Sequence, residues 1–563
     1  MTEATAKLAK GAKREESSLP SEGEKPGRSS RRAWTMRRTL LEHRALLRSV
    51  FSTRFLALLG FLACLLILVL LAAGCSSVAA PHSGTEETSD QPNIVFVLVD
   101  DLNLPSVEKM PEINSRLAGE GITFEESFVS YPTCCPSRAT MLTGLYSHNH
   151  DVRGNKQPVG GFEKFRDEGL EESTIAARLQ EEGYRTALIG KYLNGYGADD
   201  PSYVPPGWDE WYAKIGQFEY YDYELNENGQ VVSYGSEEED YLTDVLSGHA
   251  TDFVRRAAAE DDPFFTYVAP IAPHNPATPA ERHEGAFADE EVPRSPSFGE
   301  EDVSDKPSWI QDLEPVAEKA GSRIDDHHQE RLESLLAVDE MVGSLVEELE
   351  AAGELENTYI FFTSDNGFHL GSHRIRTGKK TPYEEAARVP LLARGPGVPA
   401  GSKVEGLALN TDLAPTFAEL GGLGEDFEAD GRSLLPLMRG EEIPSDWRSA
   451  VLLEAFLDGK SASEEDDEEE KGKSKGKTKG KGKDRDTGSR MDRTAFRAVR
   501  TETHKYVEHE DGERELYDLQ NDPYELENFY ETADPSLTED LKARLEALND
   551  CEGDGCREAE DDP

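Results

Sequence analysis

One run of residues limits the folds open to this chain more than any other: NIVFVLVD, at positions 93–100. Its apolar residues are continuous rather than alternating, which is typical of a strand buried on both faces of a parallel sheet. Runs of the same kind recur at 185–189, 264–268 and 359–363, with helical patterns at 174–182 and about 325–352 between them. Strands that alternate with helices predict an α/β fold, with a mainly parallel sheet flanked by helices.

Polar side chains follow two of these strands directly. Asp100 and Asp101 end the first run, and Asp365 and Asn366 come just after the run at 359–363. Because active-site groups of such sheets gather at the carboxyl ends of the strands, we expect these side chains to lie close together. Two adjacent acids would repel each other unless a cation lay between them, and hard divalent cations prefer oxygen ligands. The sequence therefore predicts a metal site; the alternative is that the aspartates only cap the strand end.

The charge balance excludes one class of partner. The chain has 111 Asp and Glu against 60 Lys and Arg, a net charge of -51, so we expect no nucleic acid bound through a broadly basic surface. Residues 1–54 are the exception, with 13 Lys and Arg against 6 Asp and Glu. This basic segment predicts a cytoplasmic or leader sequence, and the acidity belongs to the chain that follows it.

An uncharged apolar run, FLALLGFLACLLILVLLAA, occupies positions 55–73 and is long enough to cross a membrane as a helix. The arginines from Arg31 to Arg54 lie on its N-terminal side, which predicts that this side is cytoplasmic and that the downstream chain is exported. The run ends in LAAGC, which resembles a lipoprotein cleavage box with Cys75 as the lipidated residue. Residues 55–75 are therefore either an uncleaved transmembrane helix or a lipoprotein signal. Both would tether the chain to the outer face of the cytoplasmic membrane.

Composition divides the remaining chain. Residues 76–90 are a small, polar linker, 91–445 form the main domain, 446–550 form a smaller C-terminal subdomain, and 551–563 are an acidic tail. Short strand-like pieces near 496–501, 505–508 and 513–519 predict an antiparallel hairpin, followed by a helix at 535–548. The acid-rich and Gly-Lys-rich insert at 459–490 has no apolar residues that could form a core, so we expect a disordered linker. The alternative is that the insert binds an anionic polymer electrostatically. Cys551 and Cys556 are either a disulfide or two free thiols.

The most specific motif is CCPSR at 134–138, followed by ATMLTG. Further motifs stand in a fixed order along the chain: GKYLN at 190–194, APH at 272–274, SDNG at 364–367, GKKTPYE at 378–384 and LYDLQNDP at 516–523. Together they resemble the formylglycine-dependent type I sulfatases over about residues 91–550. GKYLN and PPGW at 205–208 are most similar to the N-acetylglucosamine-6-sulfatases and the extracellular heparan sulfatases.

This resemblance implies an alkaline-phosphatase-like fold and a mechanism. A maturation enzyme would oxidise Cys134 to formylglycine (3-oxoalanine), whose hydrate attacks the sulfur of a sulfate ester on a small molecule or glycan, with amino sugars as the expected substrates. Calcium, or alternatively magnesium, would orient the sulfate. The implied catalytic residues are Cys134, Arg138, Lys191, His274 and Lys379. The implied metal ligands are Asp100, Asp101, Cys134, Asp365 and Asn366.

The resemblance assigns roles to the basic residues as well. Lys191 and Lys379 would contact sulfate oxygens and Arg138 would hold the formylglycine hydrate, whereas a solvated surface charge is the alternative for each. His274 would protonate the leaving oxygen, because histidine exchanges protons near neutral pH; the alternative is a capping or core histidine. Many arylsulfatases carry a second histidine two residues after the lysine, where this chain has Leu193.

Other cysteines and histidines have open alternatives. Cys134 could be a buried thiol or pair with Cys135, for which we expect only a packing role. His369 and His373 stand four residues apart, but the glycines around them favour a loop that contacts substrate over a zinc pair. His148 and His150 are equally ambiguous.

Two rival functions remain at this point. One is a phosphodiesterase or phosphonate hydrolase of the same superfamily, and the other is an inactive envelope protein that binds glycans.

Overall fold

The computed structural model describes residues 91–216, 218–260, 262–424, 427–440, 443–457 and 495–561. These residues belong to one of the two compact units into which the chain divides, Glu87–Pro563. The predicted segments at 1–54, 55–75 and 76–90 lie outside the described residues, as does the insert at 459–490. No helix within the described ranges is both long and apolar enough to span a bilayer.

A mixed sheet forms the centre of the molecule, and the described residues contribute ten strands to it in the order β11-β2-β10-β9-β1-β8-β4-β5-β6-β7. Strand β1 (Asn93–Val99) lies between β8 (Phe264–Ala269) and β9 (Thr358–Ser364) and is parallel to both. β4 (Arg185–Gly190) and β5 (Glu210–Ile215) continue the parallel part. The predictions of a mainly parallel sheet and of a central strand at 93–100 are both confirmed.

Shorter strands complete both edges of this sheet; most pair antiparallel with a neighbour, whereas β11 is parallel to β2. Their bounds are β2 (Ile122–Phe124), β6 (Glu224–Glu227), β7 (Gln230–Ser233), β10 (Leu391–Arg394) and β11 (Ser402–Val404). β10 is antiparallel to β9 on one side, and β6 is antiparallel to β5 on the other. A separate parallel pair joins β3 (Ser127–Phe128) and β12 (Ala408–Leu409).

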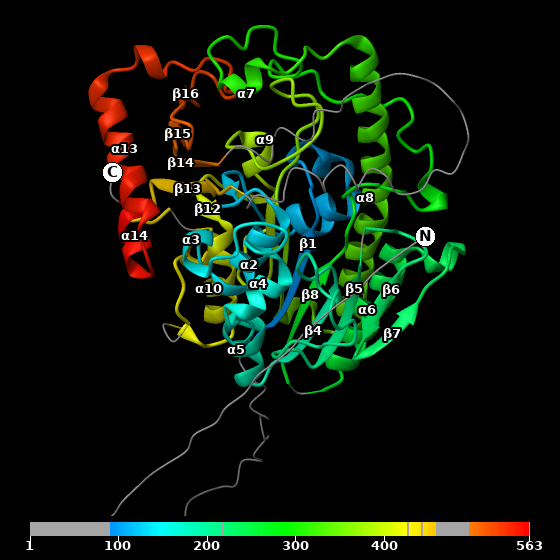
Figure 1. Ribbon diagram of the computed structural model, residues 1–563. Coiled ribbons are helices and arrows are strands. Elements are labelled where there is room, and N and C mark those ends of the chain that lie inside the picture. The colour runs from blue at the N-terminus through cyan, green and yellow to red at the C-terminus, as the bar shows by residue number, and fades with distance from the viewer. Residues whose placement is uncertain are drawn as a thin grey trace, which may run out of the picture. The chain divides into compact units, whose positions relative to one another are not determined.

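The two faces of β1 explain its continuous apolar sequence. Ile94, Phe96 and Leu98 belong to one core cluster, and Val95, Val97 and Val99 belong to another. The first cluster includes residues of α2 (Cys134–Thr143), α5 (Ile175–Glu181) and α10 (Leu413–Leu420). The second includes residues of α6 (Leu242–Ala257) and α8 (Glu318–Ala352), which pack together (Figure 1). Since each face is covered by helices, the residues of β1 after Asn93 are apolar on both faces.

Helix α8 begins earlier than the apolar pattern predicts, at Glu318 rather than near residue 325. Its first turn carries mostly exposed polar residues, so the apolar repeat starts only where the helix reaches the sheet.

The C-terminal region has its own antiparallel sheet, in which four strands are described: β13 (Ala450–Ala455), β14 (Phe496–Thr501), β15 (His504–His509) and β16 (Arg514–Asp518). The predicted hairpin is therefore part of a larger sheet, because β13, which precedes the insert in sequence, pairs with β14, which follows it. Helix α13 (Pro535–Asn549) confirms the predicted terminal helix and lies against this sheet with α14 (Asp554–Asp561) (Figure 1). Cys551 and Cys556 form a disulfide.

Candidate active site

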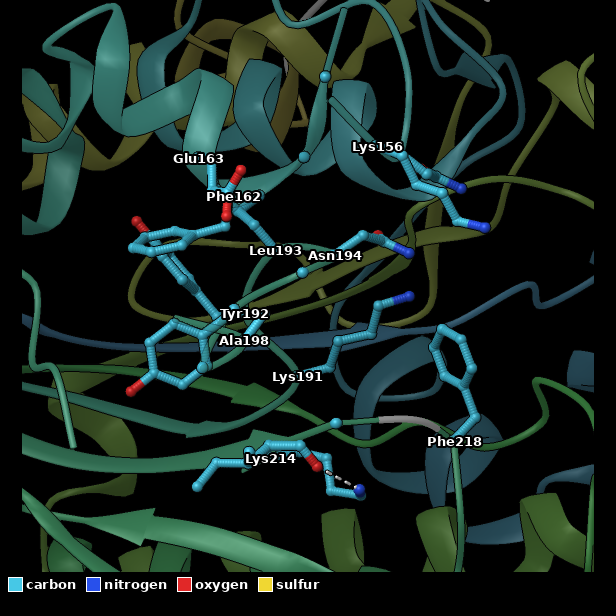
Figure 2. A pocket seen from close by; sticks show the side chains of 18 of the residues that line it. Lys156, Phe162, Glu163, Lys191, Tyr192, Leu193, Asn194, Ala198, Lys214 and Phe218 are labelled. Carbon is cyan, nitrogen blue, oxygen red and sulfur yellow. Dashed lines mark hydrogen bonds between the residues drawn. The ribbon is translucent and has the colours of Figure 1, made fainter. Parts of the chain in front are cut away.

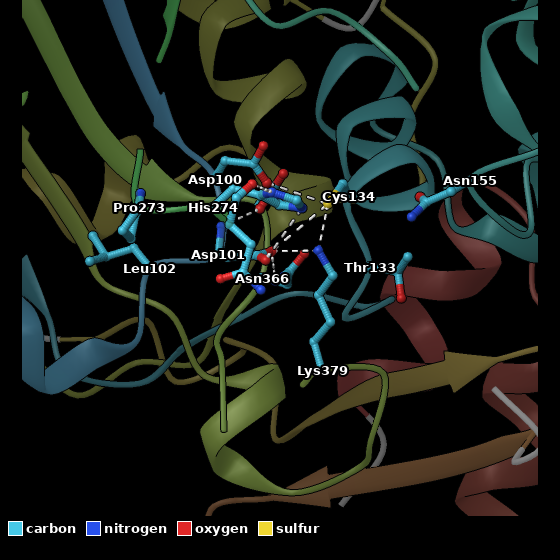
Figure 3. Close-up of polar contacts among 12 residues, drawn as sticks. Asp100, Asp101, Leu102, Thr133, Cys134, Asn155, Pro273, His274, Asn366 and Lys379 are labelled. Atoms are coloured by element: carbon cyan, nitrogen blue, oxygen red, sulfur yellow. Dashed lines mark hydrogen bonds and ion pairs between the residues drawn. The ribbon is translucent and has the colours of Figure 1, made fainter. Parts of the chain in front are cut away.

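The side chains of the predicted site converge at the carboxyl ends of the parallel strands (Figure 3). Asp100 and Asp101 follow β1, Lys191 follows β4, His274 lies beyond β8, and Asp365 follows β9. This convergence is what a parallel arrangement of these strands requires, because their carboxyl ends share one edge.

Cys134 is the first residue of α2 and points into this centre. Its side chain is buried, and its thiol donates to Asp100 Oδ1 at 3.4 Å and lies 3.8 Å from Asp101 Oδ1. The free N–H groups at the start of a helix favour negative charge, so α2 presents Cys134 where a developing anion would be stabilised.

Three cations surround Cys134 and the carboxylates. Arg138, one turn further along α2, places Nε 2.8 Å from Asp365 Oδ2 and donates from Nη1 to the Lys191 carbonyl at 2.9 Å. Lys191 Nζ is 2.7 Å from Asp100 Oδ2. Lys379 Nζ lies 2.5 Å from Asp101 Oδ1 and 2.7 Å from Cys134 Sγ. The predicted basic residues are thus all in the centre rather than at the surface.

Burial and charge perturb the acids of the centre in different directions. Burial by itself would raise the pKa of Asp100, but Lys191, with smaller contributions from His274 and Arg138, holds it well below its usual range. Burial and the neighbouring Asp100 carboxylate raise the pKa of Asp365. Burial and the carboxylates of Asp100 and Asp365 also raise the pKa of the Cys134 thiol. An unmodified Cys134 would therefore be a weak nucleophile at neutral pH.

The oxygen atoms of the centre are arranged in a way that fits a divalent cation. One carboxylate oxygen each of Asp100 and Asp101, Cys134 Sγ and a His274 nitrogen all lie within 4.8 Å of one another. Asn366 donates from Nδ2 to Asp101 Oδ1 at 2.7 Å, while its Oδ1 is buried and has no hydrogen-bond partner among the described residues. A buried carbonyl oxygen without a partner is costly, and a hard cation would satisfy it.

His274 faces the centre from the segment after β8. Its Nε2 is 3.8 Å from Asp101 Oδ2, and its Nδ1 is 2.8 Å from the Asn275 carbonyl. The imidazole stacks on Phe218 with ring centroids 3.9 Å apart, and Lys191 Nζ lies 4.8 Å from the same ring. Phe218 follows β5 in a loop, and no motif in the sequence predicted its contact with two predicted catalytic residues.

A pocket of about 560 Å³ opens beside Lys191 (Figure 2). Its walls come from four parts of the chain: residues within 155–163, residues 191–198, residues 214–216 with Phe218, and Ile271. Lys156, Glu163 and Asn194 lie around it, and Phe218 lies near Lys191. The GKYLN motif therefore supplies both a side chain of the polar centre and one wall of the pocket. A pocket of this volume is typical of sites for small ligands.

The other four histidines noted in the sequence each have a polar partner within the fold. His369 Nε2 is 2.7 Å from Thr381 Oγ1, and His373 Nδ1 is 2.8 Å from Glu300 Oε2, so the two rings have different hydrogen-bond partners. His148 Nδ1 is 3.1 Å from Glu454, and His150 Nε2 is 3.0 Å from Thr140.

Two residues that no motif predicted form hydrogen bonds to the backbone of the centre. Asn155 accepts a hydrogen bond from the backbone N–H of Cys135 at 3.0 Å, which fixes the start of α2. Arg331 of α8 donates to the backbone carbonyls of Asp101 and Pro273. Cys135 itself is fully buried in the core cluster, in agreement with the packing role expected for it.

The fold and the site together define a hydrolase of anionic esters: a buried nucleophile position, convergent carboxylates and a ring of cations beside a pocket. Comparisons with known proteins identify the family. The sulfatase family profile matches residues 92–423. N-acetylglucosamine-6-sulfatase of Capra hircus is 36% identical over 500 residues, covering 86% of this chain and 87% of the relative. The chain belongs to the sulfatase family and is a sulfuric ester hydrolase.

A bacterial relative and one solved structure agree with this assignment, and a second solved structure shares the fold. N-acetylglucosamine-6-O-sulfatase of Bacteroides thetaiotaomicron is 30% identical over 457 residues, covering 69% of this chain and 77% of the relative. A solved structure that holds its substrate D-glucosamine-2-N,6-O-disulfate is 25% identical, with a TM-score of 0.65 over 84% of this chain and 99% of that one. A phosphonate monoester hydrolase of Agrobacterium radiobacter, at 23% identity and a TM-score of 0.59 over 82% of this chain and 96% of that one, shares the fold.

Proposed function

We propose that this sulfatase hydrolyses sulfate monoesters of amino sugars or glycans, with a formylglycine made from Cys134 and a bound calcium ion. The observation that carries the proposal is the place of Cys134, at the start of α2 between the carboxylates of Asp100 and Asp101 and the ammonium group of Lys379. Formylglycine at this position would supply a hydrated aldehyde with two hydroxyl groups: one would attack sulfur and displace the alkoxide of the ester, and the other would then lose its proton to re-form the aldehyde and release sulfate.

Calcium would be held by Asp100, Asp101, Asp365 and Asn366 together with the modified Cys134, and would supply positive charge for the sulfate oxygens. Asn366 Oδ1, which is buried and without a partner among the described residues, supports this ligand set. Magnesium would be accepted less readily, because it demands a closer octahedral shell.

The chain's own residues complete the chemistry. Lys191 and Lys379 bind the nonreacting sulfate oxygens, and Arg138 orients the hydrated side chain of residue 134 while it neutralises Asp365. His274 donates a proton from Nε2 to the departing alkoxide, which a sugar hydroxyl needs because it is a poor leaving group. Phe218 keeps the imidazole in this orientation by stacking on it.

The substrate class rests on the relatives and on the pocket. The goat and human relatives are named N-acetylglucosamine-6-sulfatases, and the pocket beside Lys191 has room for a sugar ring. We therefore place the amino sugar in this pocket, with its sulfate directed at residue 134.

Peptide mass spectrometry of active enzyme tests the nucleophile. Residue 134 should be about 18 Da lighter than cysteine, because CH2SH becomes an aldehyde in the presence of the maturation enzyme. Active enzyme that carries an unmodified thiol there would refute the proposal. Cys134→Ala should abolish turnover, whereas Cys135→Ala should retain most of it because Cys135 only packs in the core.

A second experiment tests the ion and the ester. Dialysis against a chelator should lower the melting temperature and activity, and calcium should restore both, since a ligand bound only by the folded state stabilises it. Asp101→Asn should lose this calcium response. Paired sulfate and phosphonate esters separate the rival hydrolase: phosphonate cleaved faster than sulfate would contradict a sulfatase activity.

We also propose that the enzyme is exported and tethered to the outer face of the cytoplasmic membrane by residues 55–75, as lipoprotein or transmembrane anchor. The Cys551–Cys556 disulfide supports an oxidising compartment. Fractionation of cells that express the full chain, with and without residues 1–75, tests the tether. Recovery of the full chain only in the cytosol would contradict it.

A further inference from the structure

Arg331 is a buried arginine without a carboxylate partner. It lies in the middle of α8, is 0% exposed, and makes no ion pair with any acid among the described residues. Burial lowers its pKa to about 10. Burying a charge costs desolvation free energy, and the hydrogen bonds that the buried group makes must offset this cost.

The hydrogen bonds of Arg331 go to backbone carbonyls on two of the segments that form the site. Its guanidinium donates to the carbonyl oxygen of Asp101 after β1 and, at 3.0 Å, to that of Pro273 after β8. Asn103 Oδ1 lies 3.4 Å from the same guanidinium. Figure 3 shows Asp101, Pro273 and His274 at the site. Pro273 directly precedes His274, so the Arg331 side chain connects the predicted metal-binding segment to the segment of the predicted acid.

A third segment of the site lies against the same guanidinium. The ring centroid of Phe368, two residues after Asn366, is 4.3 Å from the central carbon of Arg331. A guanidinium on an aromatic face is attracted by the ring and is held in plane. Arg331 thus contacts the segments after β1, β8 and β9.

These segments need such a connection because the strand pairing ends before them. The register between β1 and β8 runs to Val97 and Val268, after which Asp100 N–H reaches the Ala272 carbonyl at 3.4 Å. Asp101 has a φ of 68°, a left-handed conformation that a residue with a side chain keeps only when its surroundings hold it. The hydrogen bond from Arg331 holds the carbonyl of that residue.

We propose that Arg331 is a positioning residue for the reaction, which sets the place of His274 relative to Asp101 and the scissile ester. The inference rests on the proposed role of His274 as the proton donor. Arg331 never touches the substrate, and its effect passes through the carbonyls of Asp101 and Pro273. Lysine cannot replace it, because one ammonium group does not span both carbonyls with a planar fork.

Two substrates with different leaving groups distinguish a positioning role of Arg331 from a role in stabilising the fold. A sugar alkoxide needs protonation, whereas 4-nitrophenolate leaves without it, so a displaced His274 harms only the first reaction. Arg331→Lys should lower kcat/KM for a glucosamine 6-sulfate about 10-fold or more, chiefly in kcat, and change kcat/KM for 4-nitrophenyl sulfate less than about threefold. Arg323→Lys, an exposed arginine on the same helix, is the matched control and should change neither.

A double-mutant cycle completes the test. His274→Gln alone should show the same leaving-group pattern, and Arg331→Lys should add little to it, because both variants remove one function. If His274→Gln affects both esters equally, the proposed acid role fails. If His274→Gln discriminates between the esters while Arg331→Lys and Arg331→Met lose both equally, the positioning role is overturned. The ratio of the two rates in one preparation does not depend on how much protein folds.

Discussion

At the scale of single residues, Lys379 carries the most exposed of the charges that meet at Cys134. Lys379→Met keeps the length of the side chain and removes the ammonium group that lies 2.5 Å from Asp101 and 2.7 Å from Cys134. We expect kcat/KM to fall about 10²- to 10³-fold, as for the loss of one preorganised group that stabilises transition-state charge. Steady-state kinetics on a sulfated amino sugar measures this. Lys403→Met, which removes a surface ion pair with Glu125, is the control, and an equal loss there would contradict the assignment.

The buried imidazole of His373, for which no catalytic role is proposed, makes the free energy of unfolding depend on pH. Burial alone would lower the pKa of His373, but the carboxylates of Glu385 and Glu300 outweigh burial and raise it to about 9. Because the folded-state pKa lies above the unfolded value of 6.5, the stabilisation is complete below pH 6.5 and is lost as the pH rises through about 9.

Urea unfolding of the wild type should therefore show a decrease of about 3 kcal/mol between pH 6.5 and 9.5 from this group alone. His373→Gln should be less stable at pH 6.5 and should lose less stability over the same interval. An unchanged pH slope in the variant would show that His373 is neutral in the folded protein.

The motifs predicted the residues that converge around Cys134, since the proposed chemistry dictates residue type and spacing. Phe218 and Arg331 escaped prediction because their roles depend on which backbone segments the fold brings beside them. The sequence nevertheless contains one signal for Arg331. It stands four residues before Leu335 and seven before Val338, on the apolar face of α8, where a charged side chain is unexpected. His369 and His373 show the opposite case, because their spacing resembles a metal site and their tertiary partners are different.

At the scale of elements, strands buried on both faces were predictable and edge strands were not. The runs at 93–100, 185–189, 264–268 and 359–363 are mainly apolar without a polar residue at every second position, since helices cover both sides of the sheet. β2, β10 and β11 have three or four residues each, too few for any periodicity to be read. β13 is apolar, but its pairing with β14 could not be foreseen, because residues 458–494 separate the two strands in sequence.

Lys505 of β15 joins the C-terminal sheet to the segment that carries Lys379. Its ammonium group is fully buried and bonds to Glu384 at 2.8 Å, to Glu525 at 2.7 Å and to the Pro382 carbonyl at 2.9 Å. Lys505→Met would leave two buried carboxylates without this cation, so we expect a loss of about 3–5 kcal/mol in the free energy of unfolding.

Denaturant titration measures that loss. Lys542→Met removes an exposed i,i+4 pair with Glu546 in α13 and should change stability by about 0.5 kcal/mol or less. A small effect at both lysines would mean that water enters and solvates the carboxylates near Lys505.

At the scale of the whole molecule, charge is distributed unevenly between surface and centre. The chain has a net charge of -51, yet the centre pairs the carboxylates of Asp100, Asp101 and Asp365 with three cations, Arg138, Lys191 and Lys379. An acidic exterior repels a polysulfated polymer at long range, whereas a small monosulfated sugar feels less of this repulsion. Added salt should therefore speed the hydrolysis of a long sulfated chain more than that of a monosaccharide.

Deletion of residues 461–488 tests how far the catalytic unit depends on the insert. β13 and β14 are adjacent antiparallel strands, with Ala455 opposite Phe496, so a short loop can connect the same two ends. Shortening the connection changes its closure entropy by only about 1 kcal/mol. We expect the deletion variant to fold and to retain most of its kcat/KM on small sulfate esters.

The extent of the deletion provides the control. A longer deletion, 461–501, removes β14 from the middle of the four described strands and should abolish soluble expression, because β13 and β15 both pair with it. Loss of folding with the shorter deletion would refute the linker interpretation of 459–490. If the shorter variant keeps its activity on monosaccharides and loses it on long sulfated glycans alone, the insert binds the polymer, which is the alternative that its lysine-rich sequence leaves open.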